Sequence, residues 1–309
     1  MPAEVSIVLE WETGAECGGD RAARGLARIA AEAAAHGRAE IIVVVDPGEG
    51  AGAVGAVESL PGEARARVVE APAPLGYYEK KNFGFGASSG AIVAFVDSDL
   101  LVEPGWLGAL LAPFTQPGCS AVVGRTHFET ATRYERAMAL FWIFDARVEA
   151  DEVRGTGRLV SNNIAFRRPL FAALPFPPRP TYRNQCAELG RTLAGLGIPL
   201  YEATAARAVH PAPAGLRAFV TRAVHSGRDA RLTAGGTGRG GQAAARAEWR
   251  ADRARVRRRI AERAPLLHSG RADRIAAFGL GFLYYAVKAA AYGVASAVPP
   301  STPAGAAAA

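Results

Sequence analysis

The chain has 309 residues, half of them apolar, so it can bury the core of one large α/β domain with appendages. Its three cysteines lack metal-site spacing, and the N-terminus lacks a basic and then apolar signal; both observations favour a reducing cytoplasm. Most of the net charge of +7 lies in residues 246–274, which contain ten arginines and four acidic residues. Trp249 is the single aromatic residue of this basic segment, which therefore lacks a series of interleaved aromatic residues, so we expect no nucleic-acid partner.

Short runs rich in Val and Ile predict the first strands, over residues 5–9, 41–45 and 67–69. Acidic side chains end the first two runs: Glu10 and Glu12 follow the first, and Asp46 follows the second. Ligands of open α/β sheets bind at the carboxyl ends of strands, so these acids are candidates for ligand binding. Capping of the following turn is the alternative role for one of Glu10 and Glu12.

The most informative stretch is residues 90–106, GAIVAFVDSDLLVEPGW. Its apolar part predicts a buried parallel strand that stops at Asp97 and Asp99, and Pro104 then begins a helix with an apolar face. The two acids therefore sit rigidly on a strand-to-helix loop. Carboxylates this close repel each other unless a cation lies beside them, and a divalent ion carrying phosphate oxygens is the usual solution. A helix-capping turn is the alternative.

Later segments predict further elements in chain order. A short helix over 53–60 precedes the central stretch; strands are expected over 121–123 and 200–204, and long helices over 130–149 and 213–232. On the last helix, Arg222, Arg228 and Asp229 face one side, where the arginines meet either phosphates or solvent.

The stretch KKNFGFGASSGAIVAFVDSD resembles the family-2 glycosyltransferases of the GT-A fold. The match comprises Lys81-Asn82, the small-residue helix that follows, the apolar strand and the Asp-x-Asp, with the family's fifteen-residue step from Asn82 to Asp97. VSIVL, EIIVVVD, EPGWL and NNIAFRRPLF add to it, so the resemblance covers about residues 4–212. It implies an α/β fold with the Rossmann-like mixed sheet of nucleotide-diphospho-sugar transferases, flanked by helices and followed by a C-terminal helical extension.

The resemblance also implies metal-dependent transfer from a nucleotide-diphosphate sugar, with inversion at the anomeric carbon. Asp97, Asp99 and His210 would hold Mn²⁺ or Mg²⁺, with Asp99 also counted as catalytic; imidazole is an acceptable ligand for Mn²⁺. The alternative for His210 is a cap before Pro211.

Residues expected at the nucleotide-sugar follow from the same resemblance. Glu10 or Glu12 would accept an N–H of the nucleotide base, and Asp46 would accept the N3–H of a pyrimidine or lie by the ribose. Lys81 and Asn82 would reach the diphosphate, and Asn163 would lie beside the sugar or diphosphate. The alternatives are a solvated lysine and a packing asparagine for Lys81 and Asn82.

One departure from the family concerns the general base. The family places an acidic pair before a D-x-x-L-x-x-R-L helix, and here Gln185-Cys186 stand in its place. Glu188 remains, about 200° round the helix from Cys186. It is a candidate catalytic base, without being equivalent to the family's acid.

The C-terminal third suggests a boundary at the glycine-rich residues 235–242. We predict a transferase domain over 1–234, this linker, a basic and then apolar helical extension over 243–298, and a disordered tail over 299–309. The apolar helix, 275–298, is long enough to span a bilayer, and it could instead lie in the membrane interface or dock on the transferase domain. These helices would bind the cytoplasmic face of a membrane.

The acceptor is a lipid phosphate, a glycan or a small hydroxyl compound. A phosphate acceptor is already anionic and needs no base, which suits the missing acidic pair; a hydroxyl acceptor would recruit Glu188 or another acid. The competing function is a non-catalytic sugar-nucleotide or polyanion-binding protein on the same fold.

Overall fold

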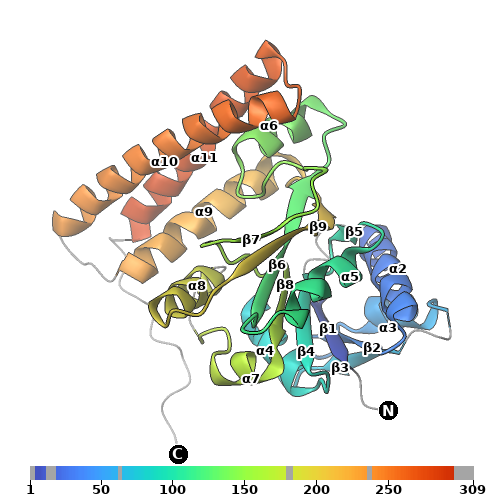
Figure 1. Ribbon diagram of the computed structural model, residues 1–309. Coiled ribbons are helices and arrows are strands. Elements are labelled where there is room, and N and C mark those ends of the chain that lie inside the picture. Colours follow the sequence, from blue (N-terminus) through green and yellow to red (C-terminus); the bar gives the residue numbers. More distant parts are fainter. Residues whose placement is uncertain (1–3, 12–18, 62–64, 179–183, 235–238, 296–309) are drawn as a thin grey trace, which may run out of the picture.

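The fold is described from a computed structural model over residues 4–11, 19–61, 65–178, 184–234 and 239–295. Its strands form one mixed sheet in the order β3-β2-β1-β4-β8-β6-β9-β5, and β7 pairs with β9 (Figure 1). The strands are β1 (Val5–Glu10), β2 (Ala39–Val45), β3 (Ala66–Glu70), β4 (Ile92–Asp97), β5 (Leu101–Val102), β6 (Ala121–Phe128), β7 (Val153–Gly155), β8 (Asn163–Arg167) and β9 (Tyr201–His210).

Strand direction changes between β4 and β8. β3, β2, β1 and β4 are parallel, and β8 is antiparallel to both β4 and β6. β6 and β9 are parallel and end together, with Phe128 opposite His210. The carboxyl ends of β1, β2 and β4 therefore meet at one edge, as the sequence predicts.

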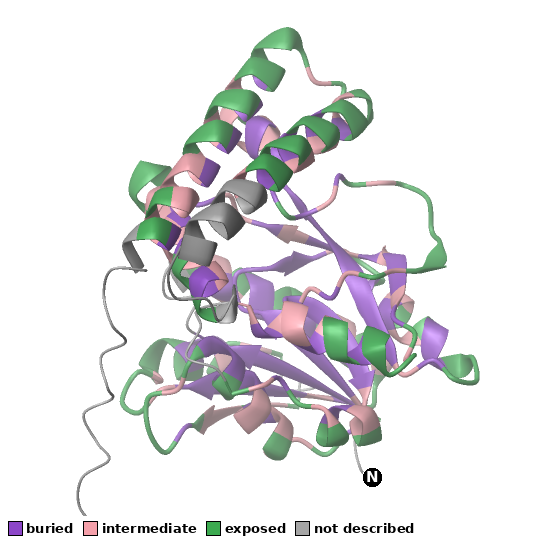
Figure 2. Cartoon of the chain, turned by 90° about the vertical axis from the view of Figure 1, so that its left-hand side faces the viewer, coloured by how far each residue is buried: buried purple, intermediate pink, exposed green. Residues whose placement is uncertain are grey.

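Helices cover both faces of the sheet. They are α2 (Gly19–His36), α3 (Ala51–Glu58), α4 (Tyr77–Gly86), α5 (Trp106–Leu111), the 3₁₀ helix η1 (Ala112–Thr115), α6 (Arg133–Phe141), α7 (Arg168–Ala173), α8 (Gln185–Gly195), α9 (Gly215–Ala234), α10 (Arg239–Leu266) and α11 (Arg271–Ala295). Figure 2 shows the strands buried and the outer faces of the helices exposed.

Two apolar clusters fill the space between sheet and helices. Alternate side chains of a strand point to opposite faces, so Ile7 and Leu9 pack with α2 and α5, whereas Val8 packs with α4 and α7. Close approach of α4 to the sheet needs Gly84, because a Cβ there would come within 2.8 Å of a Val44 methyl. The neighbouring Gly86 has open space and carries no such requirement.

Helix α6 is shorter than the predicted helix over 130–149. Thr132 caps its start, accepting a hydrogen bond from the backbone N–H of Glu135. It ends at Phe141 because α10 satisfies its last carbonyls: Arg259 donates to Phe141 O at 3.1 Å, and Arg263 donates to the carbonyls of Ala139 and Trp142. The chain then runs without helix to β7.

The C-terminal helices pack on the rest of the chain. A third cluster joins Phe141 and Trp142 to Phe219 of α9, Ile260 of α10 and Tyr285 of α11. Figure 1 shows α9, α10 and α11 side by side at one end of the sheet. Of the predicted linker, residues 235–238 lie outside the described residues and 239–242 begin α10. The division of the chain at residue 234 stays a prediction, and α10 and α11 share a core with α6 and α9.

Candidate functional site

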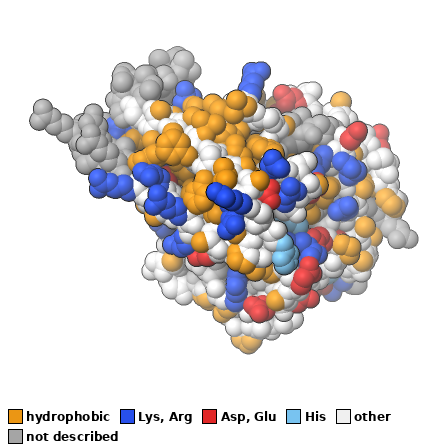
Figure 3. Space-filling view, turned by 90° about the horizontal axis from the view of Figure 1, so that it is seen from above, with side chains coloured by type: hydrophobic (Ala, Val, Ile, Leu, Met, Phe, Trp, Pro, Cys, Tyr) orange, Lys and Arg blue, Asp and Glu red, His pale blue; other side chains and the backbone are white. Residues whose placement is uncertain are grey.

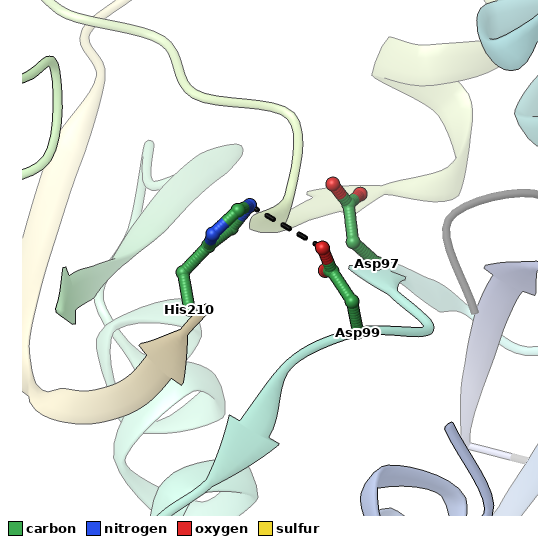
Figure 4. Close-up of side chains that lie close together, drawn as sticks. All are labelled: Asp97, Asp99 and His210. Carbon is green, nitrogen blue, oxygen red and sulfur yellow. Dashed lines mark ion pairs between the residues drawn. The ribbon is translucent and has the colours of Figure 1, made fainter. Parts of the chain in front are cut away.

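Three predicted metal ligands lie together at the carboxyl edge of the sheet. Asp97 is the last residue of β4, Asp99 follows two residues later, and His210 is the last residue of β9. The short strand β5 makes the connection: Leu101 pairs with Val209, which brings Asp99 beside His210. Figure 4 shows the Asp99 and His210 side chains turned toward each other, with 3.5 Å between Oδ2 and Nε2.

The chemistry of this cluster suits a divalent cation. One donor atom from each of the three residues lies within 4.8 Å of the others, and all three side chains are buried. Burial, with help from Arg222, lowers the pKa of His210 against the opposing effect of Asp99, so its imidazole is neutral. Two carboxylates and a neutral imidazole are ligands that Mn²⁺ and Mg²⁺ accept in proteins.

The orientation of the His210 ring strengthens this fit. Its Nδ1 lies 2.6 Å from the Pro211 carbonyl, which can only accept a hydrogen bond, so Nδ1 carries the proton. Nε2 therefore turns a lone pair toward the carboxylate of Asp99. Phe128 and Phe144 pack on the ring and hold it there. Two acceptors facing each other across 3.5 Å are stable with a cation between them.

Lys81 lies beneath this cluster. Its Nζ is 2.9 Å from Glu10 Oε2 and 2.9 Å from Asp97 Oδ1, and the side chain is fully buried. Burial alone would lower the pKa of Lys81, but Asp97 and Glu10 outweigh it and raise the pKa. In the structure, Lys81 thus neutralises the carboxylates at two neighbouring strand ends, and Glu10 binds Lys81. The predicted contacts of Lys81 with a diphosphate and of Glu10 with a base stay predictions.

Both predicted asparagines have structural partners. Asn82 donates to the Phe176 carbonyl at 2.8 Å and accepts from its N–H, which ties α4 to the segment after α7. Asn163 is fully buried; it accepts from Trp106 Nε1 at 2.9 Å and donates to the Ala206 carbonyl. Neither is among the described residues that line the pocket described below, and their role as ligands of the diphosphate or sugar stays a prediction.

Asp46 lies at the end of β2 and forms an ion pair with Lys80, with 2.7 Å between Oδ2 and Nζ. Its Oδ1 accepts from the Leu75 N–H at 3.0 Å. Its side chain keeps 17 % exposure, so it remains accessible at the strand edge where a nucleotide is predicted. Glu12 lies outside the described residues.

A pocket of about 930 Å³ opens beside the cluster and reaches the C-terminal helices. The sheet side contributes Asp97 and His210, together with Tyr77, Tyr78, Ser161 and Asn162. The helix side contributes Arg222, Ser226 and Asp229 of α9, Arg255 of α10 and Lys288 of α11. Two of the three predicted metal ligands, Asp97 and His210, thus face helices that contribute three cationic side chains to the lining.

The predicted general base is not at this pocket. Helix α8 presents Cys186, Ala187 and Arg191 to it, and Glu188 is absent from the described lining. This agrees with the 200° between Cys186 and Glu188 round the helix. Burial raises the pKa of the Cys186 thiol, so Cys186 stays protonated near neutral pH. The catalytic role of Glu188 stays a prediction, and the described lining of this pocket gives it no support.

Three pocket residues escaped the sequence analysis. Tyr77 donates its hydroxyl to Asp97 Oδ1 and stacks under the Lys81 ammonium. It precedes Lys81 by four residues, one helical turn, a spacing that could have revealed it. Arg255 and Lys288 carry no such signal, because only the packing of α10 and α11 brings them to the sheet.

A mixed sheet with an acidic pair at the end of its central strand, flanked by helices, defines the GT-A class of transferase fold. The family model described as "Glycosyl transferase family 2" matches residues 19–174, half of the chain. The chain therefore belongs to glycosyl transferase family 2 and is a glycosyltransferase enzyme. No curated protein matches it in sequence.

Solved structures share the fold at low sequence identity. The mannosyltransferase PcManGT from Pyrobaculum calidifontis, in complex with GDP-Man and Mn²⁺, has a TM-score of 0.54 at 15 % identity, covering 98 % of this chain and 77 % of that one. The glucosyl-3-phosphoglycerate synthase from Mycobacterium tuberculosis, with Mn²⁺, UDP-Glc and phosphoglyceric acid, has a TM-score of 0.51 at 20 % identity, covering 75 % and 78 %. These likenesses confirm the predicted GT-A fold.

Proposed function

We propose that the protein transfers a sugar from a nucleotide-diphosphate donor to an acceptor, with Mn²⁺ or Mg²⁺ held by Asp97, Asp99 and His210. The observation that supports this most is the lone pair of His210 Nε2 facing Asp99 across 3.5 Å. The structures of two fold relatives contain Mn²⁺ together with a nucleotide-sugar. When bound, the ion would neutralise charge on the leaving diphosphate.

The chain's own residues prepare this site. Lys81 and Tyr77 both donate to Asp97 Oδ1, which fixes the direction of that carboxylate. The hydrogen bond from His210 Nδ1 to Pro211 fixes the ring in the same way. Ligands held by a second layer of hydrogen bonds need no rearrangement when the ion and the donor arrive. Displacement of the diphosphate in line would invert the anomeric carbon.

The nucleotide end of the donor is proposed to lie at the ends of β1 and β2. Asp46 remains accessible there beside Lys80, and a carboxylate accepts ribose hydroxyls or base N–H groups. The sugar then extends toward the pocket between Asp97 and α9. This places the donor across the strand ends and the acceptor against the C-terminal helices.

The direct test is hydrolysis of a panel of purified nucleotide-sugars by the full-length protein, with and without Mn²⁺. The proposal predicts that one donor is hydrolysed slowly, only with the ion. A panel in which no nucleotide-sugar binds or reacts with either Mn²⁺ or Mg²⁺ would contradict it, and would favour a non-catalytic polyanion-binding role.

We also propose that α11 lies on a membrane surface. Ile275, Phe278 and Phe282 share one face of the helix at 61 %, 44 % and 59 % exposure. Trp249 of α10 packs on Phe282, and Figure 3 shows this apolar surface with Lys and Arg side chains around it. An apolar strip bordered by cations suits an anionic lipid surface.

The packing of α11 favours lying on the membrane over crossing it. Residues 271–293 have the length and composition of a membrane span. However, Ala277 and Tyr285 are buried in the third cluster, and Lys288 lines the pocket. A helix that spanned the bilayer would leave those contacts, so only its outer face is proposed to meet lipid.

Cosedimentation with vesicles tests the membrane proposal. Wild type should bind vesicles containing phosphatidylserine more strongly than pure phosphatidylcholine vesicles. The double variant Phe278→Ser with Phe282→Ser should bind at least about tenfold more weakly, since each substitution removes apolar area that the lipid would bury. Leu216→Ser, at an equally exposed position on α9, is the matched control and should bind as wild type does. Equal binding of all three proteins would contradict the proposal.

A further inference from the structure

The helix side of the pocket carries three cations from three different helices. Arg222 of α9, Arg255 of α10 and Lys288 of α11, which we term the cationic wall, all line the pocket opposite Asp97 and His210. Arg222 lies one turn before Ser226 on the same helix, and both face the pocket. Residues distant in sequence thus converge on one surface, as in a binding site.

A buried carboxylate holds two members of the cationic wall in place. Asp252 of α10 is 2 % exposed and forms ion pairs with both Arg255 and Lys288, the latter at 2.9 Å. Arg255, Lys288 and Asp252 together carry a net charge of +1, and Arg222 raises the net charge of the cationic wall with Asp252 to +2. Gly227 of α9 permits this arrangement, because a Cβ there would collide with the backbone of Lys288.

The cationic wall lies on the acceptor side of the metal-ligand cluster. None of the described residues that line the pocket belongs to β1, β2 or β3, at whose ends the nucleotide is proposed to bind. The wall faces the sugar end of the donor instead. A cation in this position would bind an anionic group of the acceptor as it approaches the sugar. It would also offset negative charge on the diphosphate of the donor.

Helix α8 offers the pocket a protonated thiol where the family has its acidic base. Cys186 lines the pocket, and burial keeps its thiol protonated. A hydroxyl acceptor needs a base to become a competent nucleophile near neutral pH, whereas a phosphate oxygen is already anionic. Among the described residues that α9, α10 and α11 contribute to the lining, Asp229 is the acidic one, and a hydroxyl acceptor is expected to use it as the base.

We propose, building on the proposed function, that the acceptor is a phosphomonoester whose phosphate binds Arg222, Arg255 and Lys288. One phosphate oxygen attacks the anomeric carbon and forms the new C–O bond. The bond from that carbon to the donor's diphosphate breaks, and its electron pair leaves with the nucleoside diphosphate. The dianionic monoester becomes a monoanionic diester, and no proton has to be removed.

The first test titrates inorganic phosphate into the full-length protein saturated with Mn²⁺ and nucleoside diphosphate, followed by calorimetry. Arg255→Gln with Lys288→Gln should weaken phosphate binding at least about tenfold, the effect of losing one or two charge-assisted hydrogen bonds. Arg253→Gln with Arg257→Gln is the matched control. It removes the same charge from exposed positions on α10 and should leave phosphate binding unchanged.

The variant Asp252→Asn distinguishes a phosphate-binding role of the cationic wall from a purely structural role. It removes the carboxylate that offsets the cationic wall, so phosphate should bind at least as tightly as in wild type, although the fold loses an ion-pair network. A purely structural cluster would give weaker binding in Asp252→Asn as in the Gln variants, which would overturn the proposal. So would Gln variants that bind phosphate normally but lose nucleoside diphosphate.

The second test follows radiolabelled sugar from the donor identified by hydrolysis. Transfer to a polyprenyl phosphate in detergent identifies a lipid source of the phosphate, and transfer to a soluble phosphomonoester identifies a soluble source; either supports the proposal. Transfer only to a phosphate-free hydroxyl compound, abolished in Asp229→Asn, overturns it. The proposed function fails separately, if donor binding does not depend on the divalent ion.

Discussion

Replacing Lys81 with Met tests whether this lysine is a structural counter-ion or a diphosphate ligand. Glu10 and Asp97 are paired residues of the adjacent parallel strands β1 and β4, and both bind the Lys81 ammonium. Each carboxylate oxygen lies 2.9 Å from the same nitrogen, so the two oxygens are at most 5.8 Å apart. Without the lysine, two buried negative charges face each other.

The cost follows from that geometry. At an effective dielectric constant of about 20, two like charges at this distance repel by about 3 kcal/mol. Removing one partner of a buried ion pair typically costs about 3–5 kcal/mol, because the other charge stays buried. We therefore expect Lys81→Met to lower the free energy of unfolding by about 3–5 kcal/mol. Adding Glu10→Gln should recover part of this loss, since it removes one of the two charges.

Urea unfolding followed by circular dichroism measures these changes. Lys80→Met is the matched control: it also removes a nearly buried lysine, but its partner Asp46 keeps contact with solvent, so the loss should be smaller. The reasoning fails if Lys81→Met unfolds at the wild-type urea concentration and has lost only its affinity for nucleoside diphosphate. That result would make Lys81 a ligand of the donor.

Three further predictions concern the nucleotide end, acid stability and the C-terminal helices. Asp46→Ala should weaken nucleoside diphosphate binding by about 1–3 kcal/mol in calorimetry, and wild-type affinity would exclude Asp46 from the proposed nucleotide site at the ends of β1 and β2. Burial would raise the pKa of Glu103, but hydrogen bonds from Arg147 and His127 outweigh it and lower the pKa to about 2. A lowered pKa stabilises the fold above about pH 4.5, and this contribution is lost as the pH falls toward 2. After solvent screening, Glu103→Gln should cost about 1–2 kcal/mol at pH 7 and almost nothing near pH 2; a pH-independent cost would contradict the pairing. Arg263→Met should cost about 2–4 kcal/mol in urea unfolding, because it leaves the α6 carbonyls and Asp145 without this donor; a loss below about 0.5 kcal/mol would show that another group replaces it.

The sheet was predictable because its strands are short apolar runs bounded by polar residues. The runs over 5–9, 41–45 and 92–96 appear as β1, β2 and β4, and the acids that end them converge at one edge. The GT-A fold and the transferase family also followed from the motif around Asp97. The grouping of Asp97, Asp99 and His210 was expected from the family resemblance, and the structure places their donor atoms within 4.8 Å.

Other features depend on contacts that a local pattern does not encode. The role of Lys81 depends on the register that sets Glu10 beside Asp97, so its sequence neighbours suggested a solvated or phosphate-binding lysine instead. Helix α6 stops early because arginines more than a hundred residues later bind its carbonyls. Long-range packing also brings Arg255 and Lys288 to the pocket. The predicted division of the chain at residue 234 gave no reason to expect residues of the C-terminal extension there.

The central claim is that Asp97, Asp99 and His210 hold the divalent ion that binds the donor. Calorimetry of nucleoside diphosphate binding, with and without Mn²⁺, tests it most directly in wild type and Asp99→Asn. Asn preserves the shape of the side chain but removes the charge, so we predict that the variant keeps its unfolding temperature while Mn²⁺ no longer tightens nucleotide binding. Mn²⁺-dependent affinity that is equal in the two proteins would contradict the assignment.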